Sequence, residues 1–184
     1  MHNTFQINFS LKSFTSILIG AYFFIAGYLI KLILDGFLID NNPMGMLSPE
    51  IIEILIIAIV IFVFLFSSLT LFFSGKRNAK KSQHKLWNRE TKVAFRKYIL
   101  QIIIFFTILM FVLSAGLIDY LAPVSLILYA VLLFLFKHKQ RKKLLVLSSL
   151  SLLLAVICLL IPTYWYSSIS ILGIAHIAYG VVIK

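Results

Sequence analysis

Apolar stretches, separated by short polar or basic segments, make up most of this chain. The longest have twenty or more residues, the length an α-helix needs to cross a hydrocarbon core of roughly 30 Å at about 1.5 Å per residue. The chain has 61% hydrophobic and 12% charged residues, whereas about a quarter of the residues in soluble domains are charged. Because no stretch is left for a separate soluble domain, the sequence predicts an all-α polytopic membrane protein that forms one domain over residues 1–184.

The basic residues gather between the apolar stretches. Nine of the seventeen Lys and Arg residues lie within residues 76–97, and five more lie within 137–143. A basic run alone is also typical of nucleic-acid binding. Between two spans, however, it indicates first that the loop lies on the cytoplasmic side, because Lys and Arg resist translocation. Residues 36–48 contain no Lys or Arg, as expected of a translocated loop. Both termini are therefore predicted to be cytoplasmic, and no nucleic-acid partner is predicted.

This pattern predicts six transmembrane helices arranged as three parallel helical hairpins. The hairpins cover residues of about 14–73, 98–136 and 144–183, and the basic cytoplasmic loops 75–97 and 137–143 connect them. The amino terminus lacks the features of a cleaved signal peptide, so the first apolar stretch is expected to remain as a span. The fourth stretch, residues 123–136, is short for a span. It either crosses a locally thinned bilayer or re-enters on the same side.

An internal repeat with an offset of 45 residues supports the hairpin arrangement. Residues 124–127 match residues 169–172, and the same offset places three basic residues on three others, namely Lys92, Arg96 and Lys97 on Lys137, Arg141 and Lys142. Each repeat unit would contain a basic flank, a span, a short outer turn and a second span. An even number of spans in each unit predicts parallel rather than inverted copies.

A polar side chain inside the last apolar stretch is the main candidate for chemistry. His176 lies eleven residues from Trp165 and eight from Lys184, which places it near the middle of the bilayer. It shares a helical face with Gly173 and Gly180, with Tyr179 beside it, and Ser16, Gly20 and Gly27 form a second face of small residues in the first stretch. Small residues allow close helix packing. The imidazole is therefore predicted to point inward and to bond a Ser, a Tyr or a carbonyl, with Ser125, Ser170 and Gln101 as candidate partners, or else to relay protons.

Charged residues near the ends of the spans are candidates for surface roles. Lys31 and Asp35 are spaced i, i+4 and can form an ion pair on one helical face. Ionisable residues inside a membrane are functional candidates, but both residues lie near the outer end of the span, which favours an anchoring role at the headgroups. The central basic stretch is expected to contact anionic lipid headgroups or an acidic cytoplasmic partner through Lys76, Arg77, Lys80, Lys81, Lys85 and Trp87.

Catalytic and metal-binding motifs are absent from the sequence. It contains no HExxH, phosphate-binding glycine loop, paired membrane aspartates or Ser/His/Asp set. The single cysteine, Cys158, lies in an apolar stretch, where a thiol is expected to be inert. No catalytic residue, metal or cofactor is therefore predicted.

Three stretches carry a resemblance to a known family. The sequences KLWNRETK (85–92), LAPVSLILYA (121–130) and LGIAHIAYGVV (172–182) resemble an uncharacterised bacterial family of six-span membrane proteins. In that family a KLWD-like basic stretch precedes an AP-x-(Ser or Thr)-L-I-x-Y-G span, and the protein ends in a GxLHIxYG helix. The resemblance makes His176, Tyr179 and Gly180 motif positions, whereas Asn88 and Ala130 stand where the family has Asp and Gly. In its three-hairpin layout alone, the chain is similar to acid-resistance membrane proteins of the HdeD type.

The resemblance implies the bacterial inner membrane but no established activity. The sequence therefore favours a non-enzymatic accessory, stress-related or regulatory component of that membrane, whose partners are the bilayer, its anionic lipids, and a second copy or another membrane protein. The alternative is a channel or transporter for a small solute or ion, acting as a monomer or as an oligomer. In that case His176 and Tyr179 would line the path.

Overall fold

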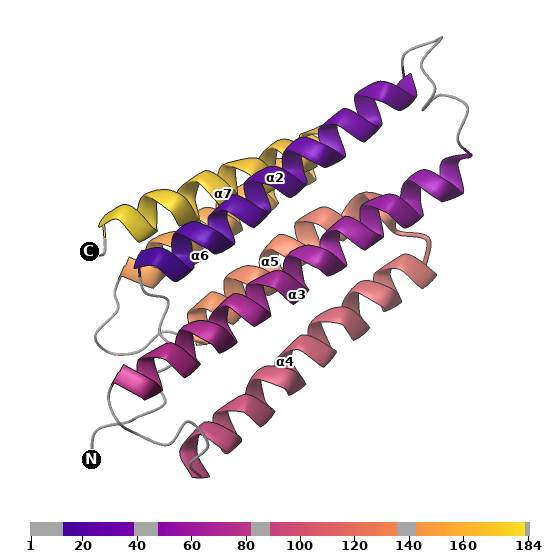
Figure 1. The fold of residues 1–184 in the computed structure, drawn as a ribbon. Helices are drawn as coiled ribbons and strands as arrows, with labels where there is room; N and C mark the ends of the chain where they lie inside the picture. The colour runs from indigo at the N-terminus through magenta and orange to yellow at the C-terminus, as the bar shows by residue number, and fades with distance from the viewer. Residues whose placement is uncertain (1–12, 39–47, 82–88, 136–142, 183–184) are drawn as a thin grey trace. The chain divides into compact units, whose positions relative to one another are not determined.

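The computed structural model describes residues 13–38, 48–81, 89–135 and 143–182. Within these ranges the chain is helical, without strands (Figure 1). Six α-helices and two short 3-10 helices are described, which are α2 (Ser13–Leu38), α3 (Pro49–Lys81), α4 (Arg89–Ser114), η2 (Ile118–Tyr120), α5 (Leu121–Leu135), α6 (Lys143–Leu160), η3 (Pro162–Tyr164) and α7 (Trp165–Val182). The predicted all-α class is confirmed for the described residues.

Four of the helical segments are long and apolar enough to cross a membrane. They are Phe14–Gly36, Glu50–Lys80, Phe95–Ser114 and Pro162–Val182. The remaining apolar helices, Leu121–Leu135 and Leu144–Leu160, are shorter. These lengths and compositions indicate a membrane protein. The predicted count of six spans and the cytoplasmic position of both termini stay predictions.

The central basic stretch is more helical than the predicted loop 75–97. Helix α3 continues to Lys81, and α4 begins at Arg89. Lys, Arg and Ala are good helix formers, and backbone groups that leave the bilayer can bond water, so the basic residues do not end a helix. The 33 residues of α3 extend over about 50 Å, well beyond a hydrocarbon core of roughly 30 Å. Residues 82–88, and residues 137–142 of the second predicted loop, lie outside the described residues.

The described residues divide into two compact units. Unit 1 contains the described residues within 71–163, and unit 2 contains those within 13–70 and 164–182. The main helix packing in unit 1 is between α5 and α6, and that in unit 2 is between α2 and α7. Both pairs join helices from different predicted hairpins. The single domain and the hairpin arrangement stay predictions.

The turn between α4 and α5 in unit 1 follows from one glycine. Gly116 has a φ of 72°, a left-handed conformation that glycine adopts without steric cost. Its N–H donates to the Leu113 carbonyl at 3.0 Å, and the next N–H, of Leu117, donates to the Val112 carbonyl at 3.1 Å. These two bonds form a Schellman motif, which satisfies the last carbonyls of α4. The chain then passes through η2 into α5.

The order of helical elements repeats in the second half of the chain. Helix α4 is followed by η2 and α5, and helix α6 is followed by η3 and α7. Helix α7 begins 44 residues after α5, one residue short of the predicted offset. Pro123 lies in the first turn of α5, which begins at Leu121 rather than at the proline as predicted. A proline costs little in a first turn because its missing N–H would have no helical acceptor there.

Candidate functional site: a buried histidine between α2 and α7

Helices α2 and α7 of unit 2 approach each other through glycines. A Cβ added at Gly20 would lie 2.5 Å from the carbonyl oxygen of Gly173. A Cβ added at Gly173 would lie 2.6 Å from the backbone nitrogen of Phe24 and 2.7 Å from the Gly20 oxygen. All of these neighbours are backbone atoms, which no side-chain rotation can move. The two helices therefore pack backbone to backbone, and only glycine fits at these two positions.

The two faces of small residues that were predicted separately lie against each other. Gly20 faces Gly173, and Gly27 faces Tyr166 and Ser170 closer to the start of α7. As residue numbers increase along α2, the numbers of the facing residues on α7 decrease, so the two helices run antiparallel. This register places Ser16, one turn before Gly20, opposite His176, nearly one turn after Gly173. A side chain on α2 thus meets the imidazole.

His176 and Ser16 form a closed hydrogen-bonded arrangement in the interior of unit 2. Both residues are 0% exposed. The Ser16 hydroxyl donates to the backbone carbonyl of His176 at 2.8 Å, and its Oγ lies 3.4 Å from Nδ1 of the same residue. A serine has one hydroxyl proton. Because that proton goes to the carbonyl, the contact between Oγ and Nδ1 is a hydrogen bond only in the tautomer in which Nδ1 carries the proton and donates it to Oγ.

An aromatic ring fixes the plane of the imidazole. The rings of Phe23 and His176 have centroids 5.9 Å apart and planes only 7° apart, in a stacked arrangement. Phe23 lies on α2, as Ser16 does, so one helix provides both the hydroxyl and the stacking surface. The imidazole is therefore held at its edge by Ser16 and at its face by Phe23. This arrangement restrains the ring and strengthens the attachment of α7 to α2.

The other candidate partners of His176 occupy different positions. The Ser170 hydroxyl donates to the Tyr166 carbonyl of its own helix at 3.2 Å, and the Ser125 hydroxyl donates to the Ala122 carbonyl at 2.7 Å. Ser125 belongs to unit 1, whereas His176 belongs to unit 2. Gln101 is half-buried on α4, and Tyr179 is buried on α7, one turn beyond His176. The structure thus brings Ser16 to the imidazole rather than either predicted serine.

The charged candidates lie at exposed positions. Lys31 and Asp35 are both exposed, one turn apart near the end of α2, and their pairing stays a prediction. Lys76, Arg77 and Lys80 are exposed on the last turns of α3. Lys81 is the final residue of α3. Lys85 and Trp87 lie outside the described residues. The three exposed cations are thus accessible for the predicted headgroup contacts.

Sequence reasoning assigned Ser16 to packing and gave no role to Phe23. The signal that identifies both residues is the register of two glycine-containing helices that are distant in the sequence. Once Gly20 is placed opposite Gly173, Ser16 follows from the helical repeat. No local pattern gives this register, because it depends on which helices pair.

The described part of the chain offers no metal centre, since no group of three or more His, Cys, Asp or Glu residues in it is able to hold an ion. Cys158 is buried on α6. Neither a scan of protein-family models nor searches of curated proteins and of solved structures return a match to this chain.

Proposed function

We propose that this protein is a non-catalytic component of the bacterial inner membrane, with an accessory, stress-related or regulatory role. In this proposal His176 is a structural element that fastens α7 to α2, not a group that handles a substrate. The observation that carries the proposal is the environment of the imidazole. The ring is fully buried, hydrogen-bonded to Ser16 and stacked on Phe23.

The burial of His176 supports this role over the transport alternative. A side chain that lines a path for ions or solutes must be reached by water or by the solute. His176 is 0% exposed, and glycines next to it bring the two backbones into contact. A path along this face would require α2 and α7 to separate, which would break the Ser16 bond and the ring stacking. The contacts therefore favour a fixed packing of α7 against α2.

The proposal includes six spans with both termini in the cytoplasm. The two shorter helices, α5 with 15 residues and α6 with 18 residues, extend over about 22 and 27 Å. Modest thinning of the bilayer would allow both to cross. The two basic clusters and the base-free segment 36–48 support the orientation. A re-entrant α5 would leave α6 and α7 with an inverted orientation.

The bacterial location is proposed from the resemblance of residues 85–92, 121–130 and 172–182 to the six-span family. In the described part of that resemblance, the family motif positions His176, Tyr179 and Gly180 are all buried on α7. Residues buried at a helix contact are constrained by packing. This placement is consistent with a motif whose residues serve the packing of α7.

Flux measurements in liposomes test the functional proposal. Purified wild type and the His176→Ala variant would be reconstituted and assayed with pH-sensitive and cation-sensitive dyes. We expect no proton or cation flux above that of protein-free liposomes from either protein. A wild-type flux that disappears in His176→Ala would replace the proposal with a transport function, and a flux retained in both would place a path elsewhere in the protein.

A further inference from the structure

Helix α4 carries exposed basic and apolar residues on one side, in an order that matches a phospholipid. Lys92, Arg96, Ile99 and Ile103 follow the spacing i, i+4, i+7 and i+11, which places them along one face of the helix. All four are exposed. The face thus begins with cations and continues with apolar side chains.

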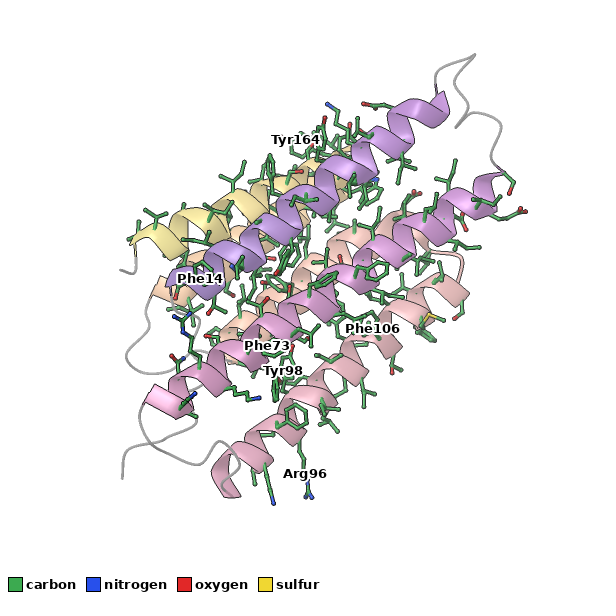
Figure 2. The ribbon with its side chains drawn as sticks, viewed as in Figure 1. Phe14, Phe73, Arg96, Tyr98, Phe106 and Tyr164 are labelled. Carbon is green, nitrogen blue, oxygen red and sulfur yellow. The ribbon has the colours of Figure 1, made fainter. Side chains whose placement is uncertain are left out.

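A second row beside the first has the same composition. Val93, Lys97, Leu100 and Ile104 follow the same spacing, one residue further along, and all four are exposed. We call the two rows together the α4 stripe. The opposite side of the helix contains Phe105 and Val112, which are seven residues apart and only 3% and 8% exposed. The α4 stripe therefore faces away from the packed side of α4, and Figure 2 shows Arg96 projecting outward from the helix.

The depth of the cations along the helix identifies the ligand. The apolar span of α4 is Phe95–Ser114, so Arg96 and Lys97 lie in its first turn and Lys92 lies one turn before them. When the apolar span of α4 crosses the hydrocarbon core, its first turn lies where lipid phosphates meet that core. The exposed apolar residues that follow lie at the level of the acyl chains. From Lys92 to Ser114 the sequence contains no Asp or Glu, so no carboxylate in this segment offsets the positive charge.

We propose that the α4 stripe is a binding site for an anionic phospholipid. Arg96 forms bidentate hydrogen bonds with the phosphate, as a guanidinium does in preference to an ammonium. Lys92 and Lys97 flank it and add electrostatic attraction. One acyl chain lies along Leu100 and Ile103. A zwitterionic lipid fits the apolar part equally well, but its own ammonium group competes with the cations, so the site selects net negative charge.

This site differs from the lipid contacts expected from the sequence. Those contacts were expected along the central basic stretch, residues 76–97, and the residues named for them end at Trp87. The α4 stripe assigns the contact to Lys92, Arg96 and Lys97 and adds the exposed apolar residues that follow them on α4. The proposal does not depend on the function of His176, because the two sites belong to different compact units.

Fluorescence quenching at two positions of α4 tests the proposal. In a background in which Trp87 and Trp165 are replaced by Phe, Leu100→Trp places a reporter within the stripe. Phe111→Trp places the control reporter near the far end of α4, at a position that is 72% exposed. Each protein is reconstituted in phosphatidylcholine vesicles that contain either brominated phosphatidylglycerol or brominated phosphatidylcholine. Quenching then gives the relative affinity of the two lipids at each position.

We expect phosphatidylglycerol to be preferred about tenfold at position 100, since each cation near an anionic lipid contributes up to about fivefold. The preference should fall as salt is added, and position 111 should show none. The triple variant Lys92→Gln/Arg96→Gln/Lys97→Gln should abolish it. The charge-conserving double variant Lys92→Arg/Lys97→Arg should retain it, which controls for a general effect of substitution.

Three outcomes would overturn the proposal. They are equal quenching by the two lipids at position 100, a preference that persists in the triple variant, and an equal preference at position 111. The first outcome would also leave the cations available to an acidic protein partner rather than to lipid. Because the substituted side chains are exposed, helical content measured by circular dichroism should be the same in all variants.

Discussion

Two helix pairs in this protein use the same bond to hold their helices together, and only one of them adds a histidine. In the α2·α7 pair, Ser16 donates to the carbonyl of His176 at 2.8 Å. In the α5·α6 pair, Ser148 donates to the carbonyl of Ala130 at 2.9 Å, and Ser151 donates to that of Leu126 at 2.8 Å. All three hydroxyls belong to buried serines and bond the backbone of the facing helix. The serine–carbonyl bond is thus a recurrent packing device.

The residues that accept these bonds carry different side chains in the two pairs. Ala130 and Leu126 accept in α5, whereas His176 accepts in α7, and all three are buried. An acceptor thus carries a methyl group in α5 and an imidazole in α7. Since the α5·α6 pair makes the same serine–carbonyl bond without an imidazole, that bond does not require the histidine.

The two contacts also differ in how closely the backbones approach. Gly20 and Gly173 leave no room for a Cβ between α2 and α7. In unit 1, Ala130 of α5 and Ala155 of α6 are buried, at 1% and 0% exposure. Glycines, which lack a Cβ, let two helix backbones approach more closely than alanines do. The α2·α7 contact therefore tolerates less added side-chain volume than the α5·α6 contact. Substitutions at His176, Gly173 and Ser16 test this difference.

Replacing His176 with Ala should have the largest effect. The variant recreates at α7 the residue found in α5, but in surroundings shaped for a ring, so it leaves a cavity. We expect a loss of about 3 kcal/mol in the free energy of unfolding, measured by denaturation in detergent micelles. Ala130→Gly, the truncation of the alanine that accepts the Ser148 bond in α5, should cost about 1 kcal/mol.

Two conservative variants of His176 separate the contributions of its two contacts. Asn presents an amide near the position of Nδ1 and should keep the Ser16 contact, whereas Phe should keep the stacking on Phe23. Each should recover part of the stability lost in His176→Ala. A loss in His176→Ala no larger than that in Ala130→Gly would show that the two pairs are energetically alike.

Gly173→Ala should have the next largest effect. The added methyl group would lie 2.6 to 3.0 Å from three backbone atoms of α2, so the helices must separate. We expect a loss of about 2 kcal/mol in the same unfolding measurement. Ala178→Val is the matched control, because Ala178 is exposed on the same helix, and its effect should stay within about 0.5 kcal/mol. A stabilised Gly173→Ala variant would mean that helix propensity outweighs the contact.

Removing the shared bond should have the smallest effect, and the same one in both pairs. Ser16→Ala and Ser148→Ala should each cost about 0.6 kcal/mol, the average for hydrogen bonds between membrane helices. Ser114→Ala is the control, because that exposed hydroxyl bonds within its own helix to the Phe111 carbonyl, and little change is expected. Unequal losses for Ser16 and Ser148 would contradict the common role of the bond.

The Ser16→Ala variant also tests which group of His176 accepts the hydrogen bond from the Ser16 hydroxyl. The main bond of Ser16 goes to a backbone carbonyl, which remains in His176→Ala. Ser16→Ala should therefore cost nearly the same in the His176→Ala background, within about 0.5 kcal/mol. A loss that disappears in this background would show that the imidazole, not the carbonyl, is the acceptor that matters.

The sequence predicted the helices better than the partners of their side chains. Apolar length and glycine spacing located the six described helices, and the small-residue faces included Ser16, Gly20, Gly173 and His176. The end of α3 was placed less well, because its last Lys and Arg residues were taken as loop residues although they propagate a helix once it leaves the bilayer. Ser125 and Ser170 were named as partners of His176, yet each bonds within its own helix.

The sequence by itself determined that this chain is helical and suited to a bilayer, because hydrophobic length and residue spacing are local properties of the chain. It also determined that His176 shares a face with glycines. Only the tertiary structure decided that this face meets α2, more than a hundred residues away in the sequence. Glycine spacing is the same whichever helix approaches, so it cannot specify a partner. The register of α2 on α7 is what makes Ser16 and Phe23 the contacts of the buried imidazole.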